Sequence, residues 1–195
     1  MRKYADMKRG MSLIELLITF VVVILLMGAL FWMLLAGKTM WQASVTRSAG
    51  RQDVQTASWR IALDLRDSKF DTITNNTSGT PSAFSFLSAY NSGGNFVTDN
   101  SGEVSWQKYI IYYIPTGTTR LLKKDVYGSF SGALTLPQLT GYCNGAGSLI
   151  SPSVTSMQLT NVGSNSATLS LTVENTSKHG TVDRQTKQIN IMIRN

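Results

Sequence analysis

Glu15 is the residue whose type and position could do the most chemistry in this sequence. It is the last charge before an apolar run over residues 16–36, and no further charged residue appears until Lys38. A carboxylate at the end of such a run is costly in a membrane unless the charge is paired or neutralised. We therefore treat Glu15 as a functional residue whose charge needs a partner.

No other set of residues suggests catalysis or metal binding. The sequence contains no Gly-rich phosphate loop, no Ser/His/Asp set and no Cys/His cluster. His179 falls in a predicted hairpin loop without a second His or Cys, and Cys143 is the single cysteine, so we expect a buried thiol there. Asp64, Asp67 and Asp71 share one side of a predicted helix end, where we expect solvated charges. We expect no catalytic residues, no cofactor, no metal and no small-molecule substrate.

The apolar run over residues 16–36 is long enough to cross a membrane. As a helix its twenty-one residues would span about 31 Å, which matches the hydrocarbon core of a bilayer. Four basic residues and one acidic residue precede it within the first ten positions, which favours a cytoplasmic N-terminus. A cleavable secretory signal has a shorter apolar region and a small-x-small site, and a lipoprotein signal needs a cysteine. An ordinary signal anchor accounts for everything except Glu15.

The sequence around Glu15 resembles the processing site of prepilin-type proteins. Type IV pilins and type II secretion pseudopilins share a short basic leader that ends in Gly. An apolar residue, Thr or Ser, two aliphatic residues, Glu and an unbroken apolar helix follow. The matching residues here are Lys8, Arg9, Gly10, Met11, Ser12, Leu13, Ile14 and Glu15.

This resemblance implies a processing and assembly pathway. A prepilin peptidase would recognise the leader through Lys8, Arg9 and Gly10. It would cleave between Gly10 and Met11 and then N-methylate Met11, which stands where Phe is commonest. In a filament, the Glu15 carboxylate would approach the Met11 amine of a neighbouring subunit. A desolvated pair of this kind would fix the axial register between subunits.

The helical pattern continues beyond the apolar run. Proline is absent from residues 38–70, and apolar residues recur there at helical spacing. These residues are Trp41, Val45, Ala49, Val54, Ala57, Ile61 and Leu65. We expect a cleaved leader over residues 1–10, the transmembrane half of a helix over 11–37 and its extramembrane half over 38–70. A globular β-rich head would cover residues 71–195.

The head is predicted to be an antiparallel β-sheet. Between residues 72 and 105, 22 of 34 residues are Ser, Thr, Asn, Gly or Pro, which indicates loops around one short strand at 84–90. A strand over 104–114 would place Val104, Trp106, Ile110, Tyr112 and Ile114 on one face, and a turn at 115–118 follows. Further strands are predicted over residues 120–127, 154–162, 167–173 and 189–193, after a glycine-punctuated stretch at 128–147. The whole is an α+β, pilin-like fold with a long N-terminal helix packed on the sheet.

The distribution of charge argues against a nucleic-acid partner. The formal charge is +7, but the first ten residues alone contribute +3. From residue 70 onward, eight basic residues face six acidic ones, a net of +2. This part contains no dense basic run of the kind that follows a phosphate backbone.

The end of the helix and the C-terminal Ile-x-Ile-x-Ile pattern are similar to J-type minor pseudopilins of type II secretion systems. This resemblance implies a structural subunit that primes a filament or lies near its tip. Its partners would be the prepilin peptidase and other minor and major pilins or pseudopilins. It would cross the bacterial inner membrane once through residues 16–36, with the head extracytoplasmic. Two alternatives remain: a minor pilin of a type IV pilus or DNA-uptake system, and a monomeric signal-anchored adhesin or sensor.

Overall fold

The computed structural model describes residues 12–163, 166–176 and 182–193. The chain divides into two compact units, Met1–Val45 and Thr46–Asn195, and each is described by itself. The first contains the N-terminal part of a long helix, α1 (Leu13–Arg66), and the second contains the rest of α1 and all strands.

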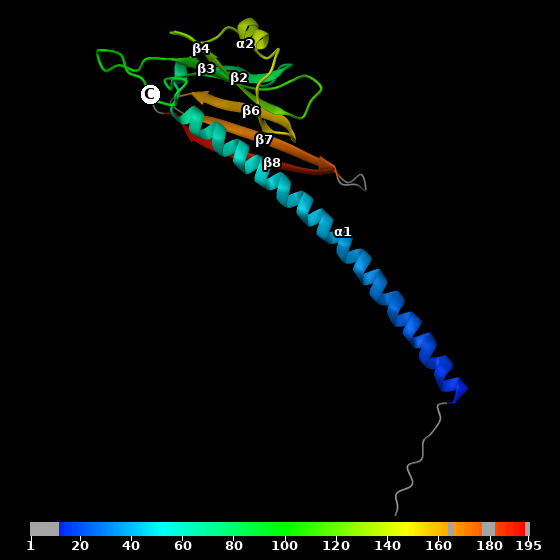
Figure 1. The fold of residues 1–195 in the computed structure, drawn as a ribbon. Helices are drawn as coiled ribbons and strands as arrows, with labels where there is room; N and C mark the ends of the chain where they lie inside the picture. The colour runs from blue at the N-terminus through cyan, green and yellow to red at the C-terminus, as the bar shows by residue number, and fades with distance from the viewer. Residues whose placement is uncertain (1–11, 164–165, 177–181, 194–195) are drawn as a thin grey trace, which may run out of the picture. The chain divides into compact units, whose positions relative to one another are not determined.

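After α1 the described chain contains antiparallel strands, one 3-10 turn and a second, short helix (Figure 1). They are a 3-10 turn (Phe70–Thr72), β1 (Thr74–Asn76), β2 (Ser82–Ser88), β3 (Lys108–Ile114), β4 (Leu121–Tyr127), α2 (Leu136–Tyr142), β5 (Ser148–Ser151), β6 (Val154–Gly163), β7 (Ser166–Thr176) and β8 (Val182–Met192).

The C-terminal part of α1 buries one face in the second unit. Val54, Ala57, Ile61 and Leu65 are buried at the spacing of one helix face, as the sequence predicts. The earlier members of the predicted apolar series, at positions 41, 45 and 49, are exposed. The helix ends at Arg66 rather than near residue 70, where one 3-10 turn follows instead.

The strands form two antiparallel sheets instead of the single predicted sheet. One sheet has the order β1-β2-β3-β4-β5 and the other has the order β6-β7-β8. The predicted strands at 84–90, 120–127, 154–162 and 167–173 are confirmed as β2, β4, β6 and β7. The strand predicted at 189–193 is the end of β8, which begins seven residues earlier at Val182, and β1 and β5 were not predicted. These two strands have only three and four residues, too few to show an alternating pattern.

The five-stranded sheet is covered on both faces. On one face, Tyr112 and Ile114 of β3 join Leu65 of α1 in a core that also includes the three-stranded sheet. On the other face, Tyr113 of β3 packs with Leu139 of α2. Figure 1 shows α2 and the C-terminal part of α1 on opposite sides of this sheet. Every residue of β3 is therefore buried.

Two details of the head differ from the sequence prediction. Because β3 begins at Lys108, Val104 and Trp106 do not continue its face: Val104 is exposed, and Trp106 packs against the core beneath α2. The glycine-punctuated stretch contains the unpredicted helix α2. Its start is fixed by the backbone N–H of Thr135, which donates to Gln138 Oε1 at 2.9 Å.

Candidate functional site

The predicted processing residues Lys8, Arg9, Gly10 and Met11 lie outside the described residues, as does His179. Their predicted roles therefore stay predictions. Ser12 is the first described residue and precedes the start of α1 by one position, so the contacts of Glu15 within the helix are defined.

Glu15 takes part in a reciprocal cap at the start of α1. The backbone N–H of Ser12 donates to Glu15 Oε2 at 3.1 Å, and the backbone N–H of Glu15 donates to Ser12 Oγ at 3.3 Å. This is the capping-box arrangement, in which two helix-end N–H groups without helical partners are satisfied at once. The Ser-x-x-Glu spacing is its sequence signal, and our reading of the sequence missed it.

The cap leaves the charge of Glu15 available to a further partner. It uses Oε2, and Oε1 accepts no hydrogen bond from any described residue. A negative charge in the first helical turn also interacts favourably with the partial positive charge of the helix N-terminus. The carboxylate therefore has a fixed local position and an open oxygen that an amine could reach.

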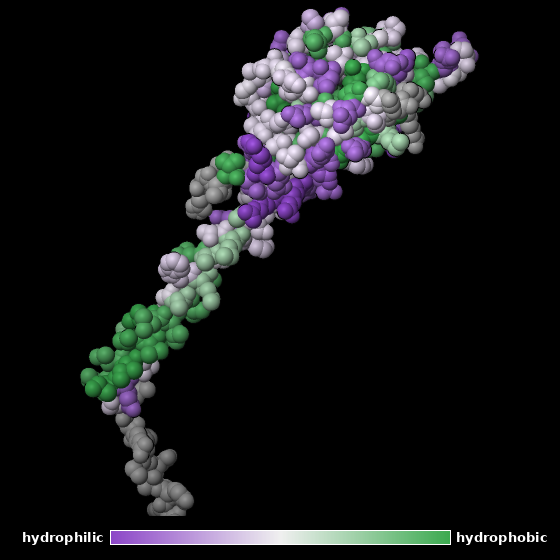
Figure 2. Space-filling view, turned by 180° about the vertical axis from the view of Figure 1, so that it is seen from behind, coloured by the Kyte–Doolittle hydropathy of each residue, from purple (hydrophilic) through white to green (hydrophobic). Residues whose placement is uncertain are grey.

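The helix surface after Glu15 is apolar and exposed. Large side chains over residues 13–36 are exposed all round the helix, with Trp32 at 77%. Figure 2 shows hydrophobic residues covering this part of α1. The helix is long and apolar enough to cross a membrane, and none of its most apolar window is buried. An apolar surface of this extent needs lipid or other apolar helices around it.

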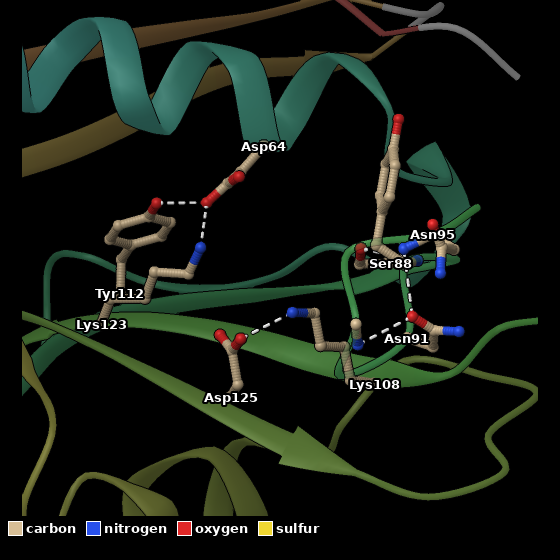
Figure 3. A network of polar contacts seen from close by, with 10 residues as sticks. Asp64, Ser88, Asn91, Asn95, Lys108, Tyr112, Lys123 and Asp125 are labelled. Carbon is tan, nitrogen blue, oxygen red and sulfur yellow. Dashed lines mark hydrogen bonds and ion pairs between the residues drawn. The ribbon is translucent and has the colours of Figure 1, made fainter.

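The head contains a second polar arrangement, where α1 meets the five-stranded sheet (Figure 3). Asp64 Oδ2 accepts hydrogen bonds from Tyr112 Oη and from Lys123 Nζ, each at 2.5 Å. Burial and the nearby Asp64 charge raise the pKa of Tyr112 above its ordinary value. The prediction that Asp64 is merely a solvated helix charge was wrong, because it joins α1 to β3 and β4.

A neighbouring ion pair joins β3 to β4. Lys108 Nζ lies 2.6 Å from Asp125 Oδ2, and Lys108 is buried. Burial disfavours the charge of Lys108, but the hydrogen bond and charge of Asp125 outweigh it, so the pKa of Lys108 lies above its ordinary value. Both arrangements hold elements together and present no activated nucleophile. Among the described residues, no three His, Cys, Asp or Glu side chains could hold a metal together.

Comparisons with protein-family models, with curated proteins and with solved structures found no match.

Cys143 is a buried thiol, as predicted. It donates to the backbone carbonyl of Leu139 at 3.2 Å, and burial raises its pKa to about 11. A thiol in this state is a poor nucleophile at neutral pH. Among the described residues that the sequence singled out, only Glu15 is an exposed charge at the start of an exposed apolar helix.

Proposed function

We propose that this chain is a membrane-anchored minor subunit of a pilus-like filament. In this proposal it is a minor pseudopilin of a type II secretion-like system that acts in filament priming or at the tip. The observation that carries the proposal is an exposed apolar helix with Glu15 in its first turn, five residues after the basic leader sequence that ends at Gly10. The resemblance of that leader to prepilin processing sites supports cleavage after Gly10 and assembly of the mature chain into a filament.

The chemistry of assembly follows from the charges at the helix start. Cleavage after Gly10 would remove the basic leader and create an amine at Met11. In the low dielectric of a membrane or filament core, an unpaired Glu15 carboxylate is unfavourable and docking onto a neighbour's Met11 amine relieves this. Because only one geometry pairs them, the contact would select an axial register.

Processing is tested by intact-mass measurement of the full chain after co-expression with a prepilin peptidase. We expect the wild-type protein to lose residues 1–10 and to gain one methyl group, while Gly10→Val keeps its full mass. A Ser12→Ala variant, changed on the other side of the cleavage bond, serves as the matched control and should still be cleaved. Wild-type protein that keeps Met1 in peptidase-containing membranes would contradict the proposal.

A monomeric signal-anchored module is the second candidate, and the Ser12–Glu15 cap favours it. The cap gives Glu15 a role within a single chain, without a neighbour. In this case the chain would stay monomeric in the membrane, and loss of the Glu15 charge would change nothing beyond the first helical turn.

A minor pilin of a type IV pilus or DNA-uptake system shares the assembly chemistry of the first candidate. Identification of the companion subunits in cross-linked filaments would distinguish a minor pilin from a minor pseudopilin.

A further inference from the structure

A pocket of about 630 Å³ lies beside the end of α1, in the second unit. Asp67 and Lys69, which follow the helix, line it together with side chains from the segment 89–107. We call it the aromatic pocket, because Tyr90, Phe96 and Trp106 contribute rings to its wall. Its volume falls within the range of small-molecule sites, roughly 300–1,000 Å³.

The segment that forms the pocket wall contains two copies of one tight turn, eight residues apart. In each turn the side-chain oxygen of the first residue, Asn91 or Asp99, accepts the backbone N–H groups two and four residues further on, at 2.8–3.0 Å. Gly94 and Gly102 occupy the same place in the two turns, with φ of 77° and 83°, where a side chain would be strained. Figure 3 shows the first turn at Asn91 and Asn95. Turns held in this way fix the wall before any ligand binds.

The rings of the pocket are held in place by their neighbours. Tyr90 and Phe96 pack edge to face with centroids 5.6 Å apart, and the hydroxyl of Tyr90 donates to Asp67 Oδ2 at 3.3 Å. Trp106 packs against the core beneath α2. Phe96 remains 51% exposed, so a ring surface is open to a ligand. Rings held in fixed positions beside a pocket favour flat or stacking ligands.

One basic and two acidic residues line the pocket, and the pairing of these charges indicates the kind of ligand. Asp67 is already paired with Arg66 Nε at 3.2 Å. Lys69 and Glu103 carry opposite charges, and neither forms an ion pair with a described residue. A ligand with a single charge would be attracted by one of these two residues and repelled by the other. An apolar ligand would cover both charges without giving them hydrogen bonds.

From these observations we propose that the aromatic pocket binds a neutral saccharide. Hydroxyl groups both donate and accept, so one sugar can donate to Glu103 and accept from Lys69. Its C–H faces would lie against the ring of Phe96. The proposal concerns only the second unit and does not depend on processing or filament assembly.

The test uses the full chain in lauryldimethylamine oxide micelles, because many other detergents carry sugar headgroups. Isothermal titration is carried out with neutral oligosaccharides of glucose, galactose, mannose and N-acetylglucosamine. We expect saturable binding of at least one of them, weakened about tenfold by Phe96→Ala. Glu103→Gln should weaken it severalfold. The matched control is Trp59→Ala, which removes an exposed ring on α1 outside the pocket and should leave binding unchanged.

Three results would overturn the proposal. The first is that no oligosaccharide in the panel binds. The second is binding that neither Phe96→Ala nor Glu103→Gln weakens, which would place the sugar elsewhere. The third is that only a peptide rich in Arg and Lys binds and that Phe96→Ala abolishes this binding. The pocket would then be a contact for a basic protein partner.

Discussion

The charge of Glu15 and its role in the helix cap can be separated by substitution. The cap uses the carboxylate as an acceptor for the N–H of Ser12, and Gln occupies the same position in capping boxes. Glu15→Gln therefore keeps the cap and removes the charge. Ser12→Ala does the opposite, because it removes the hydroxyl acceptor of the cap and leaves the carboxylate in place.

The two substitutions should differ widely in their effect on assembly. Loss of a cap reduces helix stability by about 0.5–2 kcal/mol, and α1 has 54 residues, so Ser12→Ala should disturb only its first turn. Removing one member of a buried ion pair costs about 3–5 kcal/mol, which corresponds to roughly 150-fold or more in an equilibrium constant. We therefore expect Glu15→Gln to be depleted from filaments by roughly 150-fold or more, and Ser12→Ala only severalfold.

The assay is the fraction of the full chain recovered in sheared filaments from cells that express the companion subunits. Intact mass checks that both variants are cleaved, and membrane fractionation checks that both are inserted. If Glu15→Gln enters filaments as well as wild type, or if Ser12→Ala is depleted equally, the charge is not what drives assembly. Glu15 would then be a helix cap and nothing more.

Three further predictions concern the head. Asp64→Asn should lower the free energy of unfolding by about 1–3 kcal/mol, because Tyr112 and Lys123 lose their shared carboxylate. The control Asp71→Asn changes an exposed residue and should alter this free energy by less than about 0.5 kcal/mol. Urea denaturation measures both variants, and equal effects would contradict the role of Asp64. The folded-state pKa of Lys108 is raised, so its contribution to stability is complete below the unfolded value of about 10.4 and is lost as the pH rises through the folded value. In Lys108→Met the free energy of unfolding should therefore fall less steeply above about pH 10 than in wild type. Denaturation followed by circular dichroism at several pH values measures this, and an unchanged slope would show that the charge of Lys108 does not contribute to stability. With a pKa of about 11, the Cys143 thiol should not react with Ellman's reagent at pH 8 until the head is denatured, and rapid reaction of the native protein would show that the thiol is accessible.

The strands could be predicted from the sequence where alternation is long enough to register. Ala167, Leu169, Leu171 and Val173 alternate with polar residues in β7, because one face of the three-stranded sheet is buried and the other is solvated. The strand β3 is buried on both faces. Its sequence predicted the strand and the turn that leads into its partner β4, but not its pairing with β2 or its start at Lys108. The helix α2 was missed because Pro137 and Gly141 lie within seven residues and read as turn signals.

The polar contacts of the head could not be predicted, because they depend on how separate elements meet. Helical spacing places Asp64 on one side of α1, but it does not say that β4 brings Lys123 to the same point, 59 positions later in the chain. The aromatic pocket likewise depends on how separate segments of the chain meet. Phe96 and Trp106 come together through two turns, so no periodicity in the sequence joins them.

If α1 is inserted in a membrane as proposed, the helix cap at Glu15 does not remove the need for a charged partner. Gln would satisfy the same cap without placing a charge beside an apolar run, so the cap explains an acceptor at this position and not a carboxylate. The cap and the helix N-terminus therefore offset only part of the free energy needed to desolvate the charge. The basic leader residues Lys8 and Arg9 are close in sequence, but under the proposed processing they are removed with Gly10. The amine of Met11, on this chain or on a neighbour, would then be the partner left near the carboxylate. If the partner is a neighbour's amine, the Glu15 charge is neutralised only when subunits assemble.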